Sequence, residues 1–113
     1  MDSILLTIKK MLGIETDYDG FDVDIIVGIN SAFMSLNQLG VGPEIGYSIT
    51  TIDDEWADFL VAATNLEGVK SYIYLKTRLL FDPPSNSFLV DSISKQISEL
   101  EWRLNVQADT VAE

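Results

Sequence analysis

Two adjacent prolines, Pro83 and Pro84, interrupt the chain between two segments of strongly periodic apolar residues. Proline has no backbone N–H, its ring clashes with the preceding helical turn, and the residue before it is disfavoured in helical conformation. A helix therefore has to end near Phe81 or Asp82, and a polar residue among 85–87 can cap the next one. The break predicts that the C-terminal half consists of two helices joined by a stiff corner.

Both flanking segments have the spacing of amphipathic helices. The segment from about Leu66 to Phe81 has two apolar lines, and the segment after the prolines repeats its apolar residues in steps of four, four, three and four. The second set consists of Leu89, Ile93, Ile97, Leu100 and Leu104. The pattern is lost at Gln107, so we expect a single helical domain over residues 1–106 and a frayed tail over residues 107–113.

The N-terminal half contains two more helical segments with recognisable ends. Asp2 or Ser3 can cap a first helix that ends at Gly13, because glycine readily adopts the left-handed conformation found after helix C-termini. Asp22 can cap a longer helix that runs to about Leu39. These boundaries predict that the chain is helical almost throughout.

The helical signal fails between Glu44 and Ile52. The stretch from Tyr47 onward alternates in part and is rich in β-branched residues, which is typical of an extended segment. Thr51 or Asp53 can then cap a short helix. We therefore expect a mostly α fold, a small bundle of four to five helices with a short extended or hairpin arm between the second and third helices.

The long helix predicted in the first half is apolar on two sides. A helix without a polar face lies either in the centre of a core or between its own domain and a neighbouring molecule. A chain of 113 residues is too short to cover such a helix fully, so we expect it to form oligomers. One apolar stripe consists of Val23, Ile26, Val27, Phe33 and Met34. The other contains Ala32 and the three residues to which we assign the subunit interface, Ile25, Ile29 and Leu36.

The composition excludes several classes of function. The chain has no cysteine and no histidine, which removes disulfides, thiolate metal sites and the commonest general base. Its net charge is −11, and residues 1–66 alone carry −9, so its surface repels nucleic-acid phosphates and anionic membranes. No apolar run approaches the roughly twenty residues of a membrane span, and the N-terminus lacks a signal-peptide pattern. We expect a soluble cytoplasmic product that binds neither DNA nor membranes.

An acidic turn between the first two helices partly matches a calcium-binding loop. Counted from Glu15, oxygen ligands occupy loop positions 1, 3 and 5, at Glu15, Asp17 and Asp19, and Gly20 follows at position 6. The match ends there, because position 12 is Ile26 where a bidentate glutamate is required. Asp17 and Asp19 are thus incomplete metal candidates, and a solvated turn beside a helix cap explains them as well. A small acidic calcium-responsive or regulatory binding module is the alternative function.

Two other groups of residues could carry chemistry. The carboxylates between Asp53 and Asp58 could hold a metal for hydrolysis, but an exposed first helical turn explains them better. Aromatic residues interleaved with basic ones could stack on nucleic-acid bases, although their helical spacing favours packing. They are Tyr72, Tyr74, Phe81, Phe88 and Trp102. No phosphate loop, zinc spacing or nucleophile elbow is present, so we expect no catalytic residues, no cofactor and no enzymatic activity.

Three segments of the chain are similar to a known family. They are Ile29–Gly42, Lys70–Pro84 and Glu99–Asn105. In these segments the chain resembles the head–tail connector proteins, also called adaptor or head-completion proteins, of long-tailed bacteriophages and prophages. The resemblance extends from Ile4 to Gln107 and lies in the general sequence pattern, so it identifies a family without marking active residues.

The resemblance implies a non-enzymatic virion protein. Such subunits form a ring, typically twelve-fold, beneath the portal at the neck of the particle, after synthesis in the host bacterial cytoplasm. The ring extends the channel through which DNA passes without specific binding, and a stopper or tail-completion protein docks on it. For the contacts with the portal or the tail partner, we expect Tyr47, Ile49 and Trp102 to be used.

Overall fold

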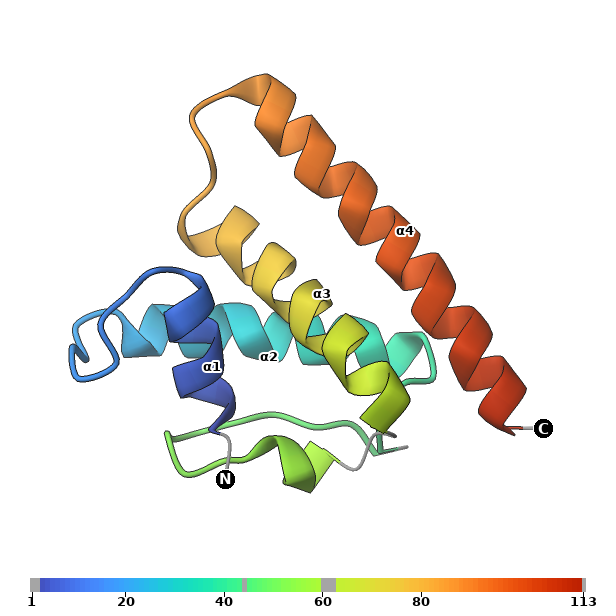
Figure 1. The fold of residues 1–113 in the computed structure, drawn as a ribbon. Helices are drawn as coiled ribbons and strands as arrows, with labels where there is room; N and C mark the ends of the chain where they lie inside the picture. The colour runs from blue at the N-terminus through green and yellow to red at the C-terminus, as the bar shows by residue number, and fades with distance from the viewer. Residues whose placement is uncertain (1–2, 44, 60–62, 113) are drawn as a thin grey trace.

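Helices dominate the computed structural model, which describes residues 3–43, 45–59 and 63–112 and omits the side chains of 63–65 and 108–112 (Figure 1). The elements are α1 (Ile4–Met11), α2 (Asp22–Gln38), the short 3₁₀-helix η1 (Trp56–Phe59), α3 (Ala63–Phe81) and α4 (Ser87–Ala112). Within these ranges there is no β-strand, only an isolated antiparallel bridge between Ser3 and Glu55. The predicted mostly α fold is confirmed.

Local capping sets the ends of α1. The Ser3 hydroxyl oxygen accepts a hydrogen bond from the Leu6 N–H at 3.3 Å, which satisfies one of the donors left unpaired in the first turn. Gly13 has a φ of 80°, the left-handed conformation in which helices commonly end. Both features were predicted from the sequence.

The start of α2 differs from the prediction. Asp22 is the first helical residue and Phe21 the N-cap, with no side-chain cap hydrogen bond. The Asp22 carboxylate instead forms an ion pair with the Lys9 ammonium group at 2.9 Å, so it is not available as a cap. Its negative charge in the first turn still favours the positive end of the helix dipole.

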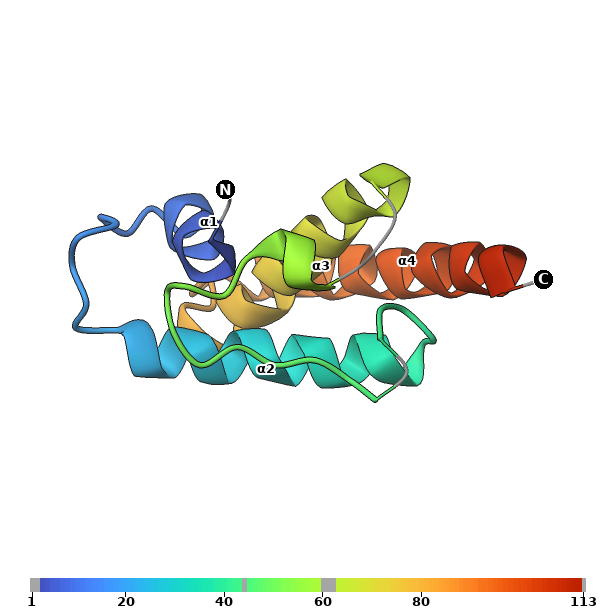
Figure 2. The ribbon, with the colours of Figure 1, turned by 90° about the horizontal axis from the view of Figure 1, so that it is seen from below.

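The core lies where α3 crosses the other helices, with α1 and η1 on one side of α2 (Figures 1 and 2). The backbones of α2 and α3 approach closely at Gly28, where an added Cβ would lie 3.0 Å from the Thr77 Cγ2 atom. This contact is tighter than nearly all real Cβ contacts, so a larger residue here would push Thr77 and α3 away from α2. The largest fully buried side chains are Tyr72, Lys9, Phe33, Phe59, Ile4, Leu5, Ile8, Ile25, Ile29, Leu36, Ile49 and Ile73.

The double-proline corner leads into α4 as predicted. Helix α3 ends at Phe81, and the Asn86 carboxamide oxygen accepts the Phe88 N–H at 2.7 Å to cap α4. The sequence pattern predicts a frayed tail from Gln107, whereas α4 runs through to Ala112. A helix already nucleated over many residues can continue through polar positions, because each added residue needs only one more backbone hydrogen bond.

Two polar contacts supplement the apolar packing of α4. The Tyr72 hydroxyl on α3 donates to the Glu101 carboxylate at 2.7 Å, and the Asn105 side chain donates to the Leu39 carbonyl at 3.1 Å. Burial and the acceptor carboxylate of Glu101 raise the pKa of the Tyr72 hydroxyl. These bonds attach α4 to the middle of α3 and to the C-terminal end of α2.

An extended segment follows α2, and it packs along the helix rather than forming a hairpin among the described residues. The Asn30 side chain holds its backbone twice, donating to the Ile49 carbonyl at 2.9 Å and accepting the Ile49 N–H at 2.7 Å. The Asp54 carboxylate accepts the N–H groups of Thr50 and Thr51, and these bonds lower the pKa of Asp54. The Trp56 indole then donates to Thr7 at 3.0 Å and ties η1 to α1.

Replacement of Ile29 tests the inner side of α2. We expect Ile29→Ala to lower the free energy of unfolding by about 2–5 kcal/mol, because it leaves a cavity in the core. Val27→Ala, on the exposed side of the same helix, is the matched control and should change that free energy by no more than about 0.5 kcal/mol. Chemical denaturation followed by circular dichroism measures both, and equal losses would contradict this arrangement of α2.

Candidate functional surfaces

The three residues assigned to the subunit interface lie inside the protomer. Ile25, Ile29 and Leu36 each have an exposed fraction of 0%, because this stripe of α2 packs into the core with α1 and α3. A side chain with no exposed surface cannot contact a neighbouring subunit unless the core opens. The assignment is corrected accordingly, and a charged residue at Ile29 would disrupt folding rather than assembly alone.

The opposite stripe of α2 is exposed at three of its five residues, whereas Phe33 is buried in the core and Ile26 is partly buried. Val23, Val27 and Met34 have exposed fractions of 75%, 63% and 68%. Sequence periodicity identifies both stripes, but only the position of α3 shows which one is covered. Exposed apolar side chains that share one helix face are typical of surfaces that contact other proteins.

This exposed stripe continues into a groove between the start of α2 and the end of α3. The groove has a volume of about 460 Å³, and its walls include Phe21, Val27, Leu80 and Phe81. The Phe21 and Phe81 rings meet edge to face, with their centroids 5.2 Å apart. Asp24 is the one charged residue among those that line it. We call these five residues the α2–α3 groove.

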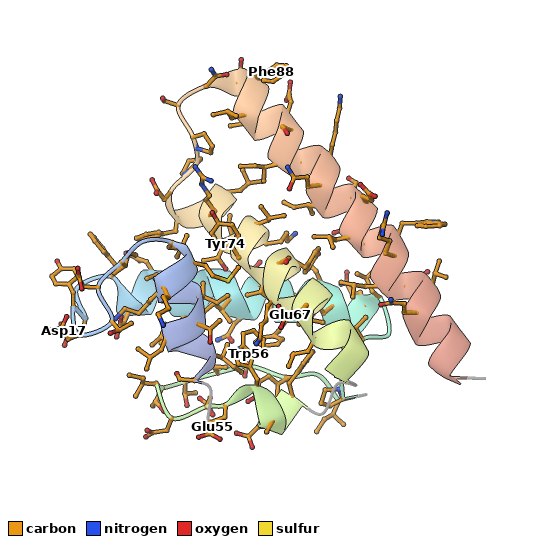
Figure 3. The ribbon with its side chains drawn as sticks, viewed as in Figure 1. Asp17, Glu55, Trp56, Glu67, Tyr74 and Phe88 are labelled. Atoms are coloured by element: carbon orange, nitrogen blue, oxygen red, sulfur yellow. The ribbon has the colours of Figure 1, made fainter. Side chains whose placement is uncertain are left out.

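A second apolar surface lies on the outer side of α4. Phe88 and Trp102 are both largely exposed, and Lys95 lies between them on the same helix face. Figure 3 shows Phe88 at the outer end of α4, away from the core. The exposure of Trp102 fits its predicted role as a partner contact, which stays a prediction.

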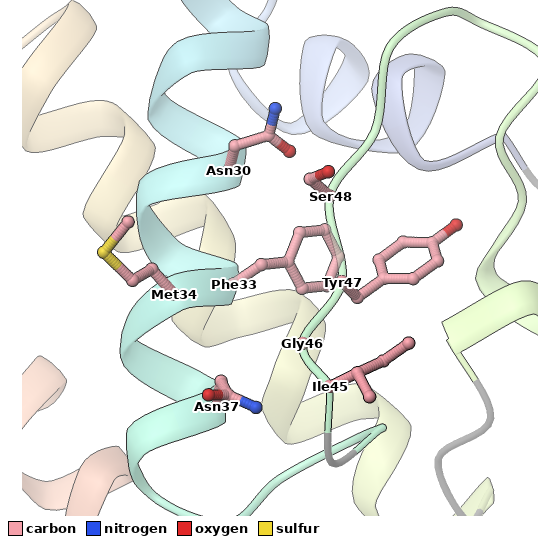
Figure 4. Close-up of a pocket in the computed structure, with 8 residues that line it drawn as sticks. All are labelled: Asn30, Phe33, Met34, Asn37, Ile45, Gly46, Tyr47 and Ser48. Carbon is pink, nitrogen blue, oxygen red and sulfur yellow. The ribbon is translucent and has the colours of Figure 1, made fainter.

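A groove of about 520 Å³ separates α2 from the extended segment after it (Figure 4). Tyr47 lines it, and its ring packs on Phe33 and Phe59 at centroid distances of 5.0 and 5.5 Å. Burial, together with nearby carboxylates, raises the pKa of the Tyr47 hydroxyl. Ile49 is buried in the core, so its assignment as a partner contact is corrected.

Ile45 is a fully exposed apolar residue that the sequence analysis did not single out on this segment. Its exposed fraction is 98%, and it lies at the rim of the groove beside Tyr47. The available signal was an apolar residue within the Gly42–Gly46 turn, since turns lie on the surface and their apolar side chains are seldom covered. Ile45 therefore joins Tyr47 as a candidate contact residue.

The acidic turn is organised around an internal cation, Lys9. The Lys9 side chain is 1% exposed, and its ammonium group donates to the carbonyl oxygens of Thr16 and Tyr18 at 3.2 and 2.5 Å. With Asp22 at 2.9 Å, it has two oxygen partners in the loop and one at the start of α2. The Phe21 ring also meets Tyr18 edge to face, at a centroid distance of 5.4 Å. The loop is thus held by a lysine that sequence analysis did not connect to it.

The metal candidates do not converge. Asp17 and Asp19 are exposed, and Figure 3 shows Asp17 at the outer edge of the loop. Among the residues that the structure describes, no group of three or more acidic, histidine or cysteine side chains could hold a metal ion. Two carbonyl oxygens of the loop already bind the Lys9 ammonium group, so this geometry provides no support for the calcium alternative.

The other chemical candidates have structural roles. Asp58 accepts the Glu55 N–H at 3.2 Å within the η1 turn, as Asp54 does for the preceding turn. The Lys70 ammonium group lies over the Trp56 ring, 5.5 Å from its centroid. The aromatic set is divided, with Tyr72 in the core and Trp102 outside, so it does not form one stacking surface.

Comparison with known families identifies the chain. The profile described as phage connector protein matches residues 4–111. The chain belongs to the phage connector protein family. No curated protein and no solved structure shows a significant match to it. The resemblance stated from the sequence segments is therefore confirmed.

Membership of the connector family agrees with the character of these surfaces. Connector proteins are structural components of phages, which supports a structural role in the virion. The described part of the chain contains no helix long and apolar enough to cross a membrane. In a connector, the exposed surfaces of α2 and α4 are the candidate contacts with other virion subunits.

Replacement of Lys9 tests the organisation of the acidic turn. We expect Lys9→Met to lower the free energy of unfolding by about 1–3 kcal/mol, because Asp22 and two backbone carbonyls lose their shared donor. Lys10→Met removes the same charge from an exposed neighbour and should change that free energy by no more than about 0.5 kcal/mol. Urea denaturation distinguishes them, and equal effects would show that Lys9 does not hold the loop.

Calcium titration tests the remaining metal hypothesis. We expect millimolar calcium to leave the Tm of the connector unchanged, because Asp17 and Asp19 are exposed and no three acidic side chains of the described residues converge on one point. Magnesium at the same concentration controls for general salt effects. A calcium-specific rise in Tm, seen by differential scanning fluorimetry, would contradict this reading of the turn.

Proposed function

We propose that this connector forms a ring beneath the phage portal and joins the DNA-filled head to the tail. Its partners in this proposal are further copies of itself, the portal protein above and a stopper or tail-completion protein below. Membership of the phage connector family supports the general role. The proposal places the protein at the neck of the virion.

The observation that carries the proposal is the pair of apolar surfaces that the protomer leaves uncovered. Two apolar residues on α2 and two on α4 are largely exposed: Val27, Met34, Phe88 and Trp102. The core is filled by other apolar residues, so these four are not needed to complete it. Two different surfaces on one subunit suit a heterologous, head-to-tail contact, which closes into a ring when its rotation permits. An isolated monomer gains nothing from exposing them.

The charge of the chain fits a channel through which DNA slides. The net charge of −11 is concentrated in the N-terminal half, at the acidic turn and around η1. Negative walls repel phosphate groups, so DNA passes without being retained. This applies to the assembled ring, because DNA meets the channel wall on every side and each subunit contributes part of that wall.

In this proposal, the contacts with the portal and the tail protein along the particle axis use a separate surface. Ile45 and Tyr47 line the groove beside α2, and none of the residues that line it belongs to α4. An exposed isoleucine next to a half-buried tyrosine provides an apolar anchor and a polar rim, the usual make-up of an interface centre. We assign this groove to the portal or the tail partner.

Electron microscopy with the cognate portal tests the proposed function. We expect the purified connector to add a ring of density, with the symmetry of the portal, to one end of the portal particle. A mixture with an unrelated ring-forming protein of similar acidity controls for charge-driven adsorption. Portal particles without added density, at connector concentrations well above those in an infected cell, would overturn the proposal.

A further inference from the structure

Four residues follow one line along the outer side of α4. Phe88 and Val106 are five turns apart at 3.6 residues per turn, and Lys95 and Trp102 fall within a narrow sector of the same line. The core residues of α4, among them Ile97, lie on the opposite side of the helix. We call Phe88, Lys95, Trp102 and Val106 the α4 ridge.

The α4 ridge and the α2–α3 groove lie on different faces of the protomer. Helix α3 packs against both α2 and α4. Val27 of the exposed α2 stripe borders Leu80 and Phe81 of α3 in the groove, whereas the α4 ridge lies opposite the core side of α4. In Figure 1, the start of α2 and the end of α3 lie toward the left, whereas the C-terminal half of α4 lies toward the right. A ridge on one side and a groove on the other allow head-to-tail contact between copies.

The two surfaces are complementary in shape and charge. The groove is concave and apolar with one carboxylate, Asp24, and α2 carries no basic residue. The ridge is convex and presents exposed Trp102 together with the cation Lys95. Asp91 and Glu99 lie on the same outer side of α4, and Glu99 is already paired with Arg103 at 2.7 Å. Tryptophan is among the residues most often found as an interface anchor, and a nearby cation can pair with the carboxylate of the groove.

We propose that the α4 ridge of one copy docks into the α2–α3 groove of the next copy in the ring. Trp102 anchors the contact against Val27 and Leu80, and Lys95 faces Asp24 of the neighbour. This inference rests on the proposed ring function and names its subunit contact. It assigns Trp102 to the neighbouring subunit instead of the portal or the tail protein.

The alternative pairing of like surfaces is unfavourable. A two-fold contact through the grooves would bring Asp24 of both copies together, with the acidic turns of both copies close by. Like charges at an interface weaken association and direct it toward oppositely charged surfaces. A contact between the α4 ridge of one copy and the α2–α3 groove of the next avoids this repulsion.

Charge reversal tests the pairing. We expect Asp24→Lys and Lys95→Glu each to weaken ring formation on the portal roughly tenfold or more, because each places like charges in the contact. The variant with both substitutions restores opposite charges at the contact, so most of the lost ring formation should return. Asp17→Lys, which makes the same charge change on the exposed turn, is the control and should assemble like the wild type. Electron microscopy and native mass spectrometry measure occupancy, and circular dichroism checks folding.

Cross-linking tests which surfaces meet. The chain has no cysteine, so Ser31→Cys beside the groove and Ser98→Cys beside the ridge provide unique thiols at exposed positions. With a flexible bis-maleimide, we expect rings of the doubly substituted chain to give a ladder of covalent oligomers, and rings of either single variant to give monomers. Covalent dimers of a single variant would reveal a like-with-like contact and overturn the inference, as would transfer of the Ser98→Cys cross-link to the portal.

The controls separate this inference from the proposed function. If the wild type adds no ring to the portal, the ring function fails and the contact fails with it. If the wild type forms rings and the charge-reversal variants form them equally well, the ring function stands and only the assigned contact is wrong. Recovery by the double variant, together with the covalent ladder, supports both.

Discussion

The close packing of α2 against α3 determines how the rest of the molecule is arranged. Gly28 lets the two backbones approach at Thr77, and this brings the Ile25, Ile29 and Leu36 stripe fully into the core. Because α1 and η1 lie on the core side of α2 (Figure 2), Val23, Val27 and Met34 on the other side stay largely exposed. A core of this size can bury one side of an apolar helix, and the side left over becomes a contact surface.

Polar tethers position the segments that apolar packing alone would leave loose. Lys9 gathers the acidic turn by binding its carbonyl groups and Asp22, and Asn30 fixes the extended segment along α2. Buried polar groups have to be paired, so each tether specifies one conformation of its loop. The result is a subunit whose loops are shaped before it meets any partner, which reduces the ordering that assembly requires.

Most of the fold follows from local rules, and those parts were predicted. Ser3, Gly13 and the Pro83–Pro84 corner act on the backbone within a few residues, so their effects can be read without knowledge of the tertiary structure. The errors concern long-range contacts. Asp22 binds Lys9 instead of capping α2, Ile49 is buried, and the exposed Ile45 was overlooked. Of the α4 ridge the sequence predicted only Trp102 as a contact residue, and its counterpart across α2 and α3 required the groove itself.

The sequence by itself determined the helical class, the helix ends next to capping residues, the acidic charge and the connector family. These properties depend on composition, on the 3.6-residue period and on short-range capping, all of which are present in the order of residues. Only the tertiary structure decided which stripe of α2 is buried and which oxygens Lys9 binds. Periodicity defines two faces of a helix but not the direction in which each points, because that direction depends on which distant helix packs against it.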